Sequence, residues 1–242
     1  MTNRERRLRT LLFGKSDRCP LEPGTGRKST IENWRRQGLP ENVKAGEISQ
    51  YVYKLLGGKF DFSPGIKNVK INQRMIPEFE EIVIQRNENS QIVQDWKGNV
   101  CEIGLEFDPS HLRNAVDFVT RRWIKCPVES RSDWRDMMKR YDAMDPERVI
   151  EEDFVPEDLE LDRKNYLEVR INGPYWQLRE WCGFEGLSMM FYDDPILVKE
   201  MIIFWEDFVF ALLKRIFKSI IPDEVHISED MAYKNFAMLS PE

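Results

Sequence analysis

The segment 166–230 constrains the fold more than any other part of the chain, because it repeats one pattern. Residues 166–172 alternate apolar and polar side chains, as a β-strand with two unlike faces does, and a turn at Gly173 leads into a helical stretch. A longer helix is predicted from Pro195, with apolar residues at three- and four-residue intervals. Residues 225–230 then alternate again. Two successive strand-helix steps predict a parallel α/β fold, since parallel strands need crossover helices.

The polar side chains of these two strands have one parity. In a closed barrel that parity faces the interior near the carboxyl-terminal mouth, where such barrels carry their sites. The residues concerned are Asn172, His226, Ser228 and Asp230. An edge strand with one face in water gives the same alternation. The pattern alone leaves both interpretations open.

The first half of the chain predicts a different kind of sheet. Short alternating runs occupy residues 69–103 and are broken by Asn87-Glu88-Asn89 and Lys97-Gly98-Asn99, which are typical turn sequences. We therefore expect a small antiparallel strand insertion near residues 69–103. With 242 residues, 41% of them hydrophobic, the chain can bury a full core, and we expect a single domain over residues 1–242.

Charge and cysteine content argue against several classes of partner. The net charge is −6 and the 36 basic residues are scattered, so no nucleic acid is expected. Four cysteines without a Cys-x-x-Cys pair argue against a zinc ribbon and a disulfide framework. Residues 1–10 lack an apolar signal region, and charged residues interrupt the apolar stretch 195–221. We expect a cytoplasmic protein with no membrane partner.

A series of short motifs runs through the chain in a characteristic order. The most specific are Gly173-Pro174-Tyr175-Trp176-x-Leu178, Gly183-x-Glu185-Gly186-Leu187, Asp194-Pro195, Glu229-Asp230-Met231 and Leu239-Ser240-Pro241-Glu242. Together they resemble the uroporphyrinogen decarboxylase (URO-D) superfamily, which includes cobalamin-related methyltransferases. The resemblance implies an α/β fold of the (β/α)8 TIM-barrel type. Because the family continues past the Ser-Pro motif, we expect an N-terminal portion whose barrel is incomplete at the C-terminus and only marginally stable by itself.

The sequence departs from the decarboxylase at three places. The family holds substrate carboxylates with an arginine-rich N-terminal loop, and here only Arg27 and Lys28 could replace that clamp. The family's substrate-facing tyrosine would align with Trp181, and its serine with Asp230. These differences argue against uroporphyrinogen itself as the substrate.

The resemblance also bears on cofactors. The methyltransferase relatives bind zinc through residues beyond the Ser-Pro motif, and His226-x-Ser228 lacks their thiolate. Zinc prefers three or four N, S or O ligands, and the chain has two histidines with no suitably spaced cysteine. We expect no metal and no cofactor, with zinc or a corrinoid relevant only to methyl transfer.

Two residues are candidates for catalysis. Asp230 could accept hydrogen bonds from pyrrole N–H groups or act as a general acid or base, because a carboxylate at a barrel mouth is partly desolvated. Its alternative role is to cap a turn. His226 could transfer a proton, or could be a hydrogen-bonded strand residue.

Further residues are candidates for substrate binding. Aromatic rings stack on flat ligands and guanidinium groups pair with carboxylates, although ordinary helix packing would explain the same side chains. The candidates are Arg27, Asn172, Tyr175, Trp176, Arg179, Trp181, Tyr233 and Lys234.

The expected function follows from the resemblance. We expect a carboxy-lyase acting on a tetrapyrrole-like small-molecule acid, or a relative serving corrinoid-linked methyl transfer, with a homodimer as the family's usual assembly. The rival hypothesis is a non-catalytic binding or scaffold member, or an inactive fragment, because the arginine clamp is missing.

Overall fold

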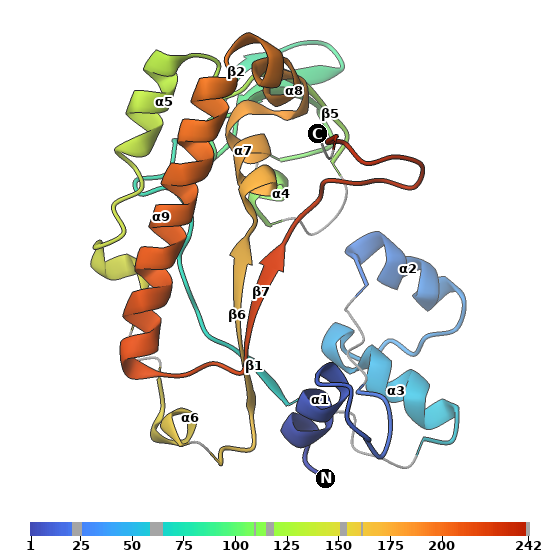
Figure 1. Cartoon of the computed structure of the whole chain (residues 1–242). Coiled ribbons are helices and arrows are strands. Elements are labelled where there is room, and N and C mark those ends of the chain that lie inside the picture. Colours follow the sequence, from blue (N-terminus) through green and yellow to red (C-terminus); the bar gives the residue numbers. More distant parts are fainter. Residues whose placement is uncertain are drawn as a thin grey trace. The chain divides into compact units, whose positions relative to one another are not determined.

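The computed structural model describes residues 1–20, 26–58, 65–108, 110–114, 119–150, 154–160 and 162–240. They fall into two compact units. The first unit is Met1–Lys67, Asn114–Phe118 and Asp162–Tyr166, and the second is Asn68–Arg113, Val119–Leu161 and Leu167–Glu242. Figure 1 shows the elements of both units. The single domain expected over the whole chain stays a prediction.

The first unit is built mainly from short helices. They are α1 (Asn3–Leu11), α2 (Lys28–Arg36), the 3-10 turn η1 (Ala45–Glu47) and α3 (Ile48–Leu55). A capping box starts α1: the Thr2 hydroxyl accepts from the Glu5 N–H at 3.1 Å, and the Glu5 carboxylate accepts from the Thr2 N–H at 2.8 Å. The buried Arg6 pairs with Asp17 through two bonds of 2.6 and 2.9 Å, which fixes the chain after α1.

Two parallel strands form the centre of the second unit. The strand order of their sheet is β1 (Ile66–Asn68), β6 (Tyr166–Asn172) and β7 (Glu224–Ser228), of which Ile66, Lys67 and Tyr166 are counted with the first unit. Strands β6 and β7 are parallel, so the pairing expected from the two strand-helix steps is confirmed (Figure 1). The pairs Glu168–Glu224, Arg170–His226 and Asn172–Ser228 are in register, which places these polar residues on one face.

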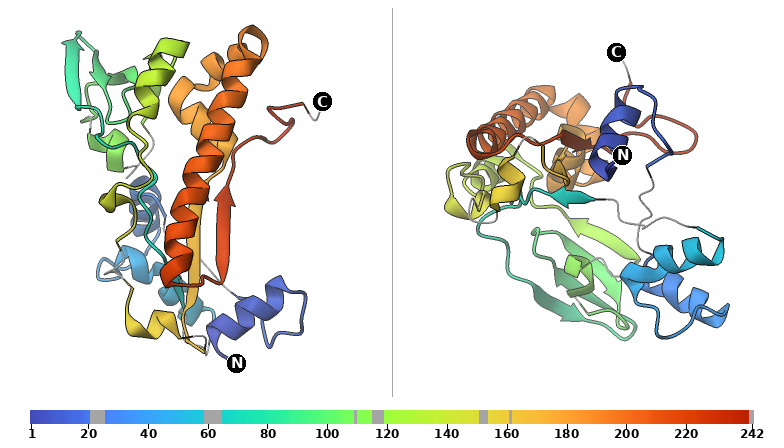
Figure 2. Two further views of the ribbon diagram at one scale, coloured as in Figure 1. Left: turned by 60° about the vertical axis from the view of Figure 1, so that its left-hand side comes forward. Right: turned by 90° about the horizontal axis from the view of Figure 1, so that it is seen from below.

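The crossover between β6 and β7 consists of α7 (Pro174–Cys182), α8 (Phe184–Asp193) and α9 (Pro195–Ser219). Asp194 caps α9 by accepting from the Leu197 N–H at 3.1 Å. Figure 2 shows α9 running alongside the two strands. Its apolar stripe is buried in the main core: Leu197, Met201, Trp205, Phe208, Leu212 and Ile216. Among the described residues, no helix combines the length and the apolar character that a bilayer crossing needs.

Tyr141 lies at the centre of an aromatic cluster in that core. Its ring makes edge-to-face contacts with Trp181, Trp205 and Phe208 at centroid distances of 5.3, 6.0 and 5.3 Å. Burial raises the pKa of the Tyr141 hydroxyl to about 12, so the group stays neutral. The cluster therefore joins α7, α9 and the segment after α5 (Arg131–Met138) through apolar contacts.

Arg148, in the 3-10 turn η2 (Pro146–Arg148), is buried next to these rings, with 1% of its surface exposed. Its guanidinium donates to the backbone carbonyls of Asn72, Arg140 and Asp142 at 3.2, 2.8 and 3.1 Å, and also to that of Arg74. Desolvation lowers the pKa of Arg148 from its usual value. Backbone carbonyls thus satisfy a buried cation, and these bonds link η2 to the segments 72–74 and 140–142.

A four-stranded antiparallel sheet forms the other part of the second unit. Its strands are β2 (Ile82–Arg86), β3 (Ser90–Gln94), β4 (Val100–Gly104) and β5 (Arg121–Lys125), in that order. Val93, Cys101, Ile103 and Val119 form its own buried cluster. Two short helices, α4 (Ser110–Asn114) and α6 (Pro156–Leu159), complete the described elements.

The expected (β/α)8 TIM barrel is wrong. The described residues form a three-stranded parallel sheet and a four-stranded antiparallel sheet, not eight strand-helix repeats. Residues 82–104 are antiparallel as expected, but β5 extends this sheet to Lys125, so it is no small insertion in a barrel. The error has a physical cause: alternation reports two unlike faces, and a central strand (β6) and an outer strand (β7) both show it without closure.

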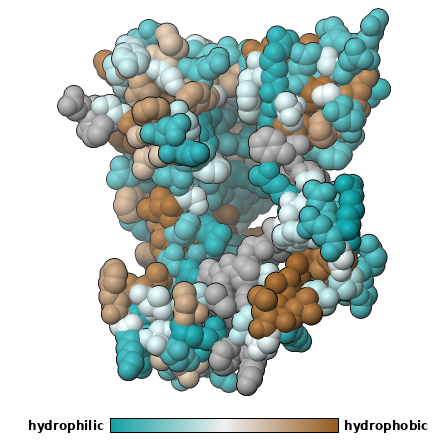
Figure 3. Space-filling model, turned by 90° about the vertical axis from the view of Figure 1, so that its right-hand side faces the viewer, coloured by the Kyte–Doolittle hydropathy of each residue, from teal (hydrophilic) through white to brown (hydrophobic). Residues whose placement is uncertain are grey.

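The face in Figure 3 is largely hydrophilic, with hydrophobic side chains in separate groups. Isolated exposed apolar residues are normal for a folded protein, so this face carries no functional argument.

Candidate functional site

The first candidate site lies at the carboxyl ends of β6 and β7. Glu229 follows β7, and its carboxylate accepts from the backbone N–H groups of Tyr175 and Trp176, both at 2.9 Å. These groups lie in the first turn of α7, where helix N–H groups lack helical partners and favour a negative charge. Gly173 donates its N–H to the Ser228 carbonyl at 2.7 Å. The turn after β6 and the segment after β7 are thus bonded together.

Arg179 and Asp230 form an ion pair beside this turn. Arg179 Nη2 donates to Asp230 Oδ2 at 2.5 Å, and Nη1 donates to the Asp230 carbonyl at 3.1 Å. The Arg179 side chain is 20% exposed and that of Asp230 is 44% exposed. The guanidinium lies 5.9 and 5.6 Å from the ring centres of Tyr175 and Trp176. A half-exposed carboxylate, a guanidinium and two rings therefore occur together, and their role in ligand binding stays a prediction.

The residues after Asp230 form a small hairpin against α7. Met238 donates its N–H to the Met231 carbonyl at 2.8 Å, and Tyr233 donates to Phe236 at 3.0 Å. Tyr175 Oη contacts Met238 Sδ at 3.7 Å, which connects the hairpin to α7. Burial raises the pKa of Tyr175, and the nearby Arg179 cation partly offsets this shift.

The hairpin carries two of the expected binding residues at its exposed end. Tyr233 is 57% exposed and packs against the Phe236 ring at 6.2 Å. Lys234 is exposed beside it. Both are accessible to a ligand, and their role in binding stays a prediction.

Asn172 has an internal role that the sequence did not reveal. Its side-chain amide donates to Gln177 Oε1 at 3.0 Å, and its carbonyl accepts from Trp205 Nε1 at 2.9 Å. Its backbone N–H donates to Gln73 Oε1 at 2.8 Å. Asn172 thus fixes the end of β6 against α7 and α9.

Trp181 lies in the aromatic core and not beside the Arg179–Asp230 pair. It is 0% exposed and donates its indole N–H to the Tyr141 hydroxyl at 2.9 Å. Its position is that of a packing residue, although it aligns with a substrate-facing residue in the resemblance. Arg27 belongs to the first unit, where it is the N-cap residue of α2.

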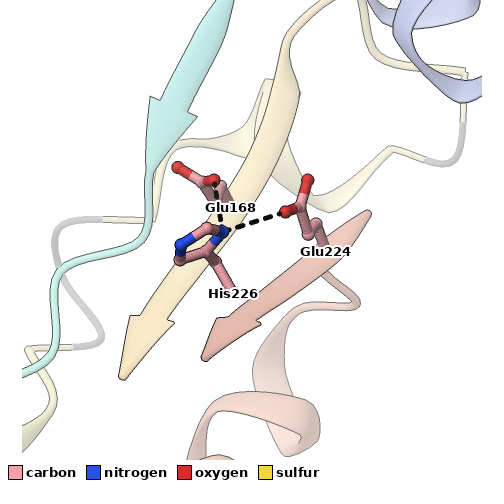
Figure 4. A group of neighbouring side chains, drawn as sticks. All are labelled: Glu168, Glu224 and His226. Carbon is pink, nitrogen blue, oxygen red and sulfur yellow. Dashed lines mark hydrogen bonds and ion pairs between the residues drawn. The ribbon is translucent and has the colours of Figure 1, made fainter. Parts of the chain in front are cut away.

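His226 belongs to a second candidate site, shown in Figure 4. Its Nδ1 lies 3.4 Å from Glu224 Oε1 on the same strand and 4.0 Å from Glu168 Oε1 on β6. Arg170 Nε donates to the other oxygen of Glu168 at 2.6 Å. The two catalytic candidates therefore have different neighbours. His226 lies beside carboxylates on the strands, whereas Asp230 pairs with Arg179 beyond the strand ends.

Sequence reasoning missed three acidic residues in these two sites. Glu168 and Glu224 have the same parity as His226, but their proximity depends on the register of the parallel strands. Glu229 was part of a quoted motif, yet only the fold shows its carboxylate on the N-terminus of α7. The alternation of polar residues along the two strands was the sequence signal that could have identified Glu168 and Glu224.

A third region holds two cysteines. A cavity of about 910 Å³ in the second unit is lined by residues of β5, α5, α8 and the turn between α7 and α8, including Cys126 and Cys182. Burial raises the pKa of Cys126 to about 11 and that of Cys182 to about 12. Both thiols are therefore protonated at neutral pH, which argues against a nucleophilic role.

Comparison with protein-family models, curated proteins and solved structures gave no significant match.

Proposed function

We propose that the chain binds a carboxylate-bearing tetrapyrrole-type ligand at the carboxyl ends of β6 and β7, in the manner of the URO-D superfamily that its motifs resemble. The observation that carries the proposal is the Arg179–Asp230 pair beside the rings of Tyr175 and Trp176. A guanidinium, a carboxylate and an aromatic surface are the groups that such a ligand needs.

The location in the fold supports this proposal. In open parallel sheets, ligands bind outside the carboxyl ends of the strands. The turn after β6 and the segment after β7 meet there through Glu229. Residues from two segments 51 positions apart are thereby held in a fixed geometry, as ligand binding requires.

Each group has a distinct role. The Arg179 guanidinium attracts a ligand carboxylate, and the Trp176 ring offers a surface for a flat macrocycle. The half-exposed Asp230 carboxylate accepts hydrogen bonds from pyrrole N–H groups. If the reaction is decarboxylation, a proton adds to the pyrrole ring and Asp230 stabilises the resulting cation. The bond between the side-chain carbon and its carboxylate then breaks, CO₂ leaves, and the electron pair of that bond neutralises the ring cation. The side-chain carbon takes up a proton and the ring releases the proton it gained, so that one proton replaces CO₂ overall.

Titration with uroporphyrin, coproporphyrin and mesoporphyrin tests the binding step, because these porphyrins carry successively fewer carboxylates. Quenching of tryptophan fluorescence reports binding. We expect Arg179→Gln to lower the affinity for uroporphyrin about tenfold or more, because a hydrogen bond to a charged group is lost. The affinity for mesoporphyrin should fall much less.

The matched control is Arg131→Gln. Arg131 forms a similar exposed ion pair, at 2.7 Å from Asp194, at the start of α9. Equal effects of the two variants, or equal weakening of all three porphyrins, would contradict the proposal. Mass spectrometry of the reduced porphyrinogens then detects loss of CO₂. Binding without such loss would favour the non-catalytic rival.

A further inference from the structure

The geometry points to a metal site: we propose that Glu168, Glu224 and His226 bind one divalent transition-metal ion, of which Zn²⁺ is the representative. The site lies on the polar face of β6 and β7, and its three residues are not partners in the bonds of the Arg179–Asp230 pair, which lies after the end of β7. It is independent of the proposed tetrapyrrole binding.

The distances suit a single ion. One ligand atom from each residue lies within 4.8 Å of the other two, and His226 Nδ1 lies 3.4 Å from Glu224 Oε1 and 4.0 Å from Glu168 Oε1. Two ligand atoms each about 2.1 Å from zinc are about 3.4 Å apart at the tetrahedral angle. Small side-chain rotations therefore bring all three atoms to one ion.

The backbone fixes this arrangement. Glu168 and Glu224 are directly paired across the parallel strands, and His226 is two residues beyond Glu224 on the same face. Strand positions vary less than loop positions, so little ordering is needed when the ion binds. Figure 4 shows the three side chains converging from the two strands.

Arg170 acts as a positioning residue. Its guanidinium donates to Glu168 Oε2 at 2.6 Å, while Oε1 of the same carboxylate is the atom near His226. Outer partners of this kind orient ligands in metal sites. The Glu168 side chain is 0% exposed, and the adjacent Arg170 cation offsets part of the cost of burying its charge.

The donor set identifies the class of ion. One imidazole nitrogen with two carboxylate oxygens suits Zn²⁺ and its neighbours, whereas Mg²⁺ and Ca²⁺ prefer oxygen alone. The His226 side chain is 44% exposed and that of Glu224 is 21% exposed, so the site opens to solvent on one side. Three protein ligands leave a position for water or an anionic ligand, as in catalytic zinc sites.

The test is titration of the chelator-treated full chain with ZnCl₂ by calorimetry, with Co²⁺ absorption as a second readout. We expect one ion per chain. His226→Ala and Glu224→Gln should each lower the affinity for zinc at least about tenfold, which is the effect seen when the coordination of a metal site is disturbed. Both positions are partly exposed, so these variants should fold, and circular dichroism checks that they do.

The matched control is His111→Ala. His111 is the chain's other histidine and is bonded locally to the Asp108 backbone. Its loss should leave zinc affinity unchanged. Zinc binding that is absent from the wild-type chain, or that survives both ligand variants undiminished, would overturn the proposal. Because no porphyrin is present, this outcome is distinct from failure of the tetrapyrrole proposal.

Discussion

Trp181 donates its indole N–H to the hydroxyl of Tyr141 at 2.9 Å, which joins α7 to the segment after α5 inside the core. We predict that Trp181→Phe lowers the free energy of unfolding by roughly 2 kcal/mol, because it removes a buried hydrogen bond and leaves a cavity. Urea unfolding followed by circular dichroism measures the change. Trp123→Phe, at a position 50% exposed, is the control and should change little.

The same variant decides the role of Trp181. If Trp181→Phe abolishes porphyrin binding at unchanged stability, the residue faces the ligand as the resemblance implies. Lower stability with retained binding supports the packing role.

Gly173→Ala should disrupt the site at the carboxyl end of β6. The backbone there, with φ −69° and ψ 163°, suits any residue, so glycine is needed for space. A Cβ would overlap the Glu229 carboxylate. We expect a loss of about 1–3 kcal/mol, as overpacking causes, and a smaller loss when Glu229→Ala is also present. Denaturant unfolding of the wild type, the two single variants and the double variant gives the coupling free energy between positions 173 and 229.

Gly186→Ala is the control for that substitution. Gly186 lies inside α8, and a Cβ there meets nothing within 4 Å. Alanine favours a helix over glycine, so a gain of about 0.5–1 kcal/mol is expected. A loss at Gly186 similar to that at Gly173 would mean that space beside Glu229 is not the cause.

Asp17 should make the first unit sensitive to acid. Two hydrogen bonds from Arg6 hold the pKa of this carboxyl at about 2, below its ordinary 3.8. A lowered folded-state pKa gives stability that is present above 3.8 and lost as the pH falls towards 2. The stability difference between wild type and Asp17→Asn should therefore shrink over this window. A constant difference in unfolding experiments across the window would refute the assignment.

The four thiols should react in a fixed order. Burial raises the pKa of Cys101 and Cys126 to about 11 and that of Cys182 to about 12, whereas Cys19 is exposed. With iodoacetamide at about pH 8, we expect modification of Cys19 first and of the others only after unfolding, since the thiolate is the reactive form. Peptide mass spectrometry identifies the sites. Early labelling of Cys126 would show that its cavity admits reagents and ionises the thiol.

The spacing of apolar residues predicted the strands and helices whose pattern lies within one short segment of sequence. The alternation in β6 and β7 and the apolar stripe of α9 gave two parallel strands with a helical crossover, and these are observed. Barrel closure was not predictable in the same way, because it depends on how many strands pair and in what order. The resemblance supplied that expectation, and the sheet order overturned it.

The sites show the same division. The sequence analysis named Asp230 and Arg179 as candidates, but their pairing joins residues 51 positions apart and could be seen only in the fold. The grouping of His226 with Glu168 depends on strand register, which the sequence does not encode locally. Glu168 and Glu224 were missed as metal ligands because carboxylates are common along the chain, whereas histidines and cysteines are few.

The buried guanidinium of Arg148 has a consequence for how part of the second unit keeps its shape. The segments around Asn72 and Arg140 are neither helix nor strand over most of their length, and one side chain bonds to the carbonyls of both. It works as a non-covalent cross-link beside two isolated backbone bonds, from the Asn72 N–H to the Arg148 carbonyl and from the Ile76 N–H to the Arg140 carbonyl, both at 2.8 Å. Loss of this one side chain would remove its four bonds at once and leave those two backbone bonds, whereas a ladder would fray one bond at a time.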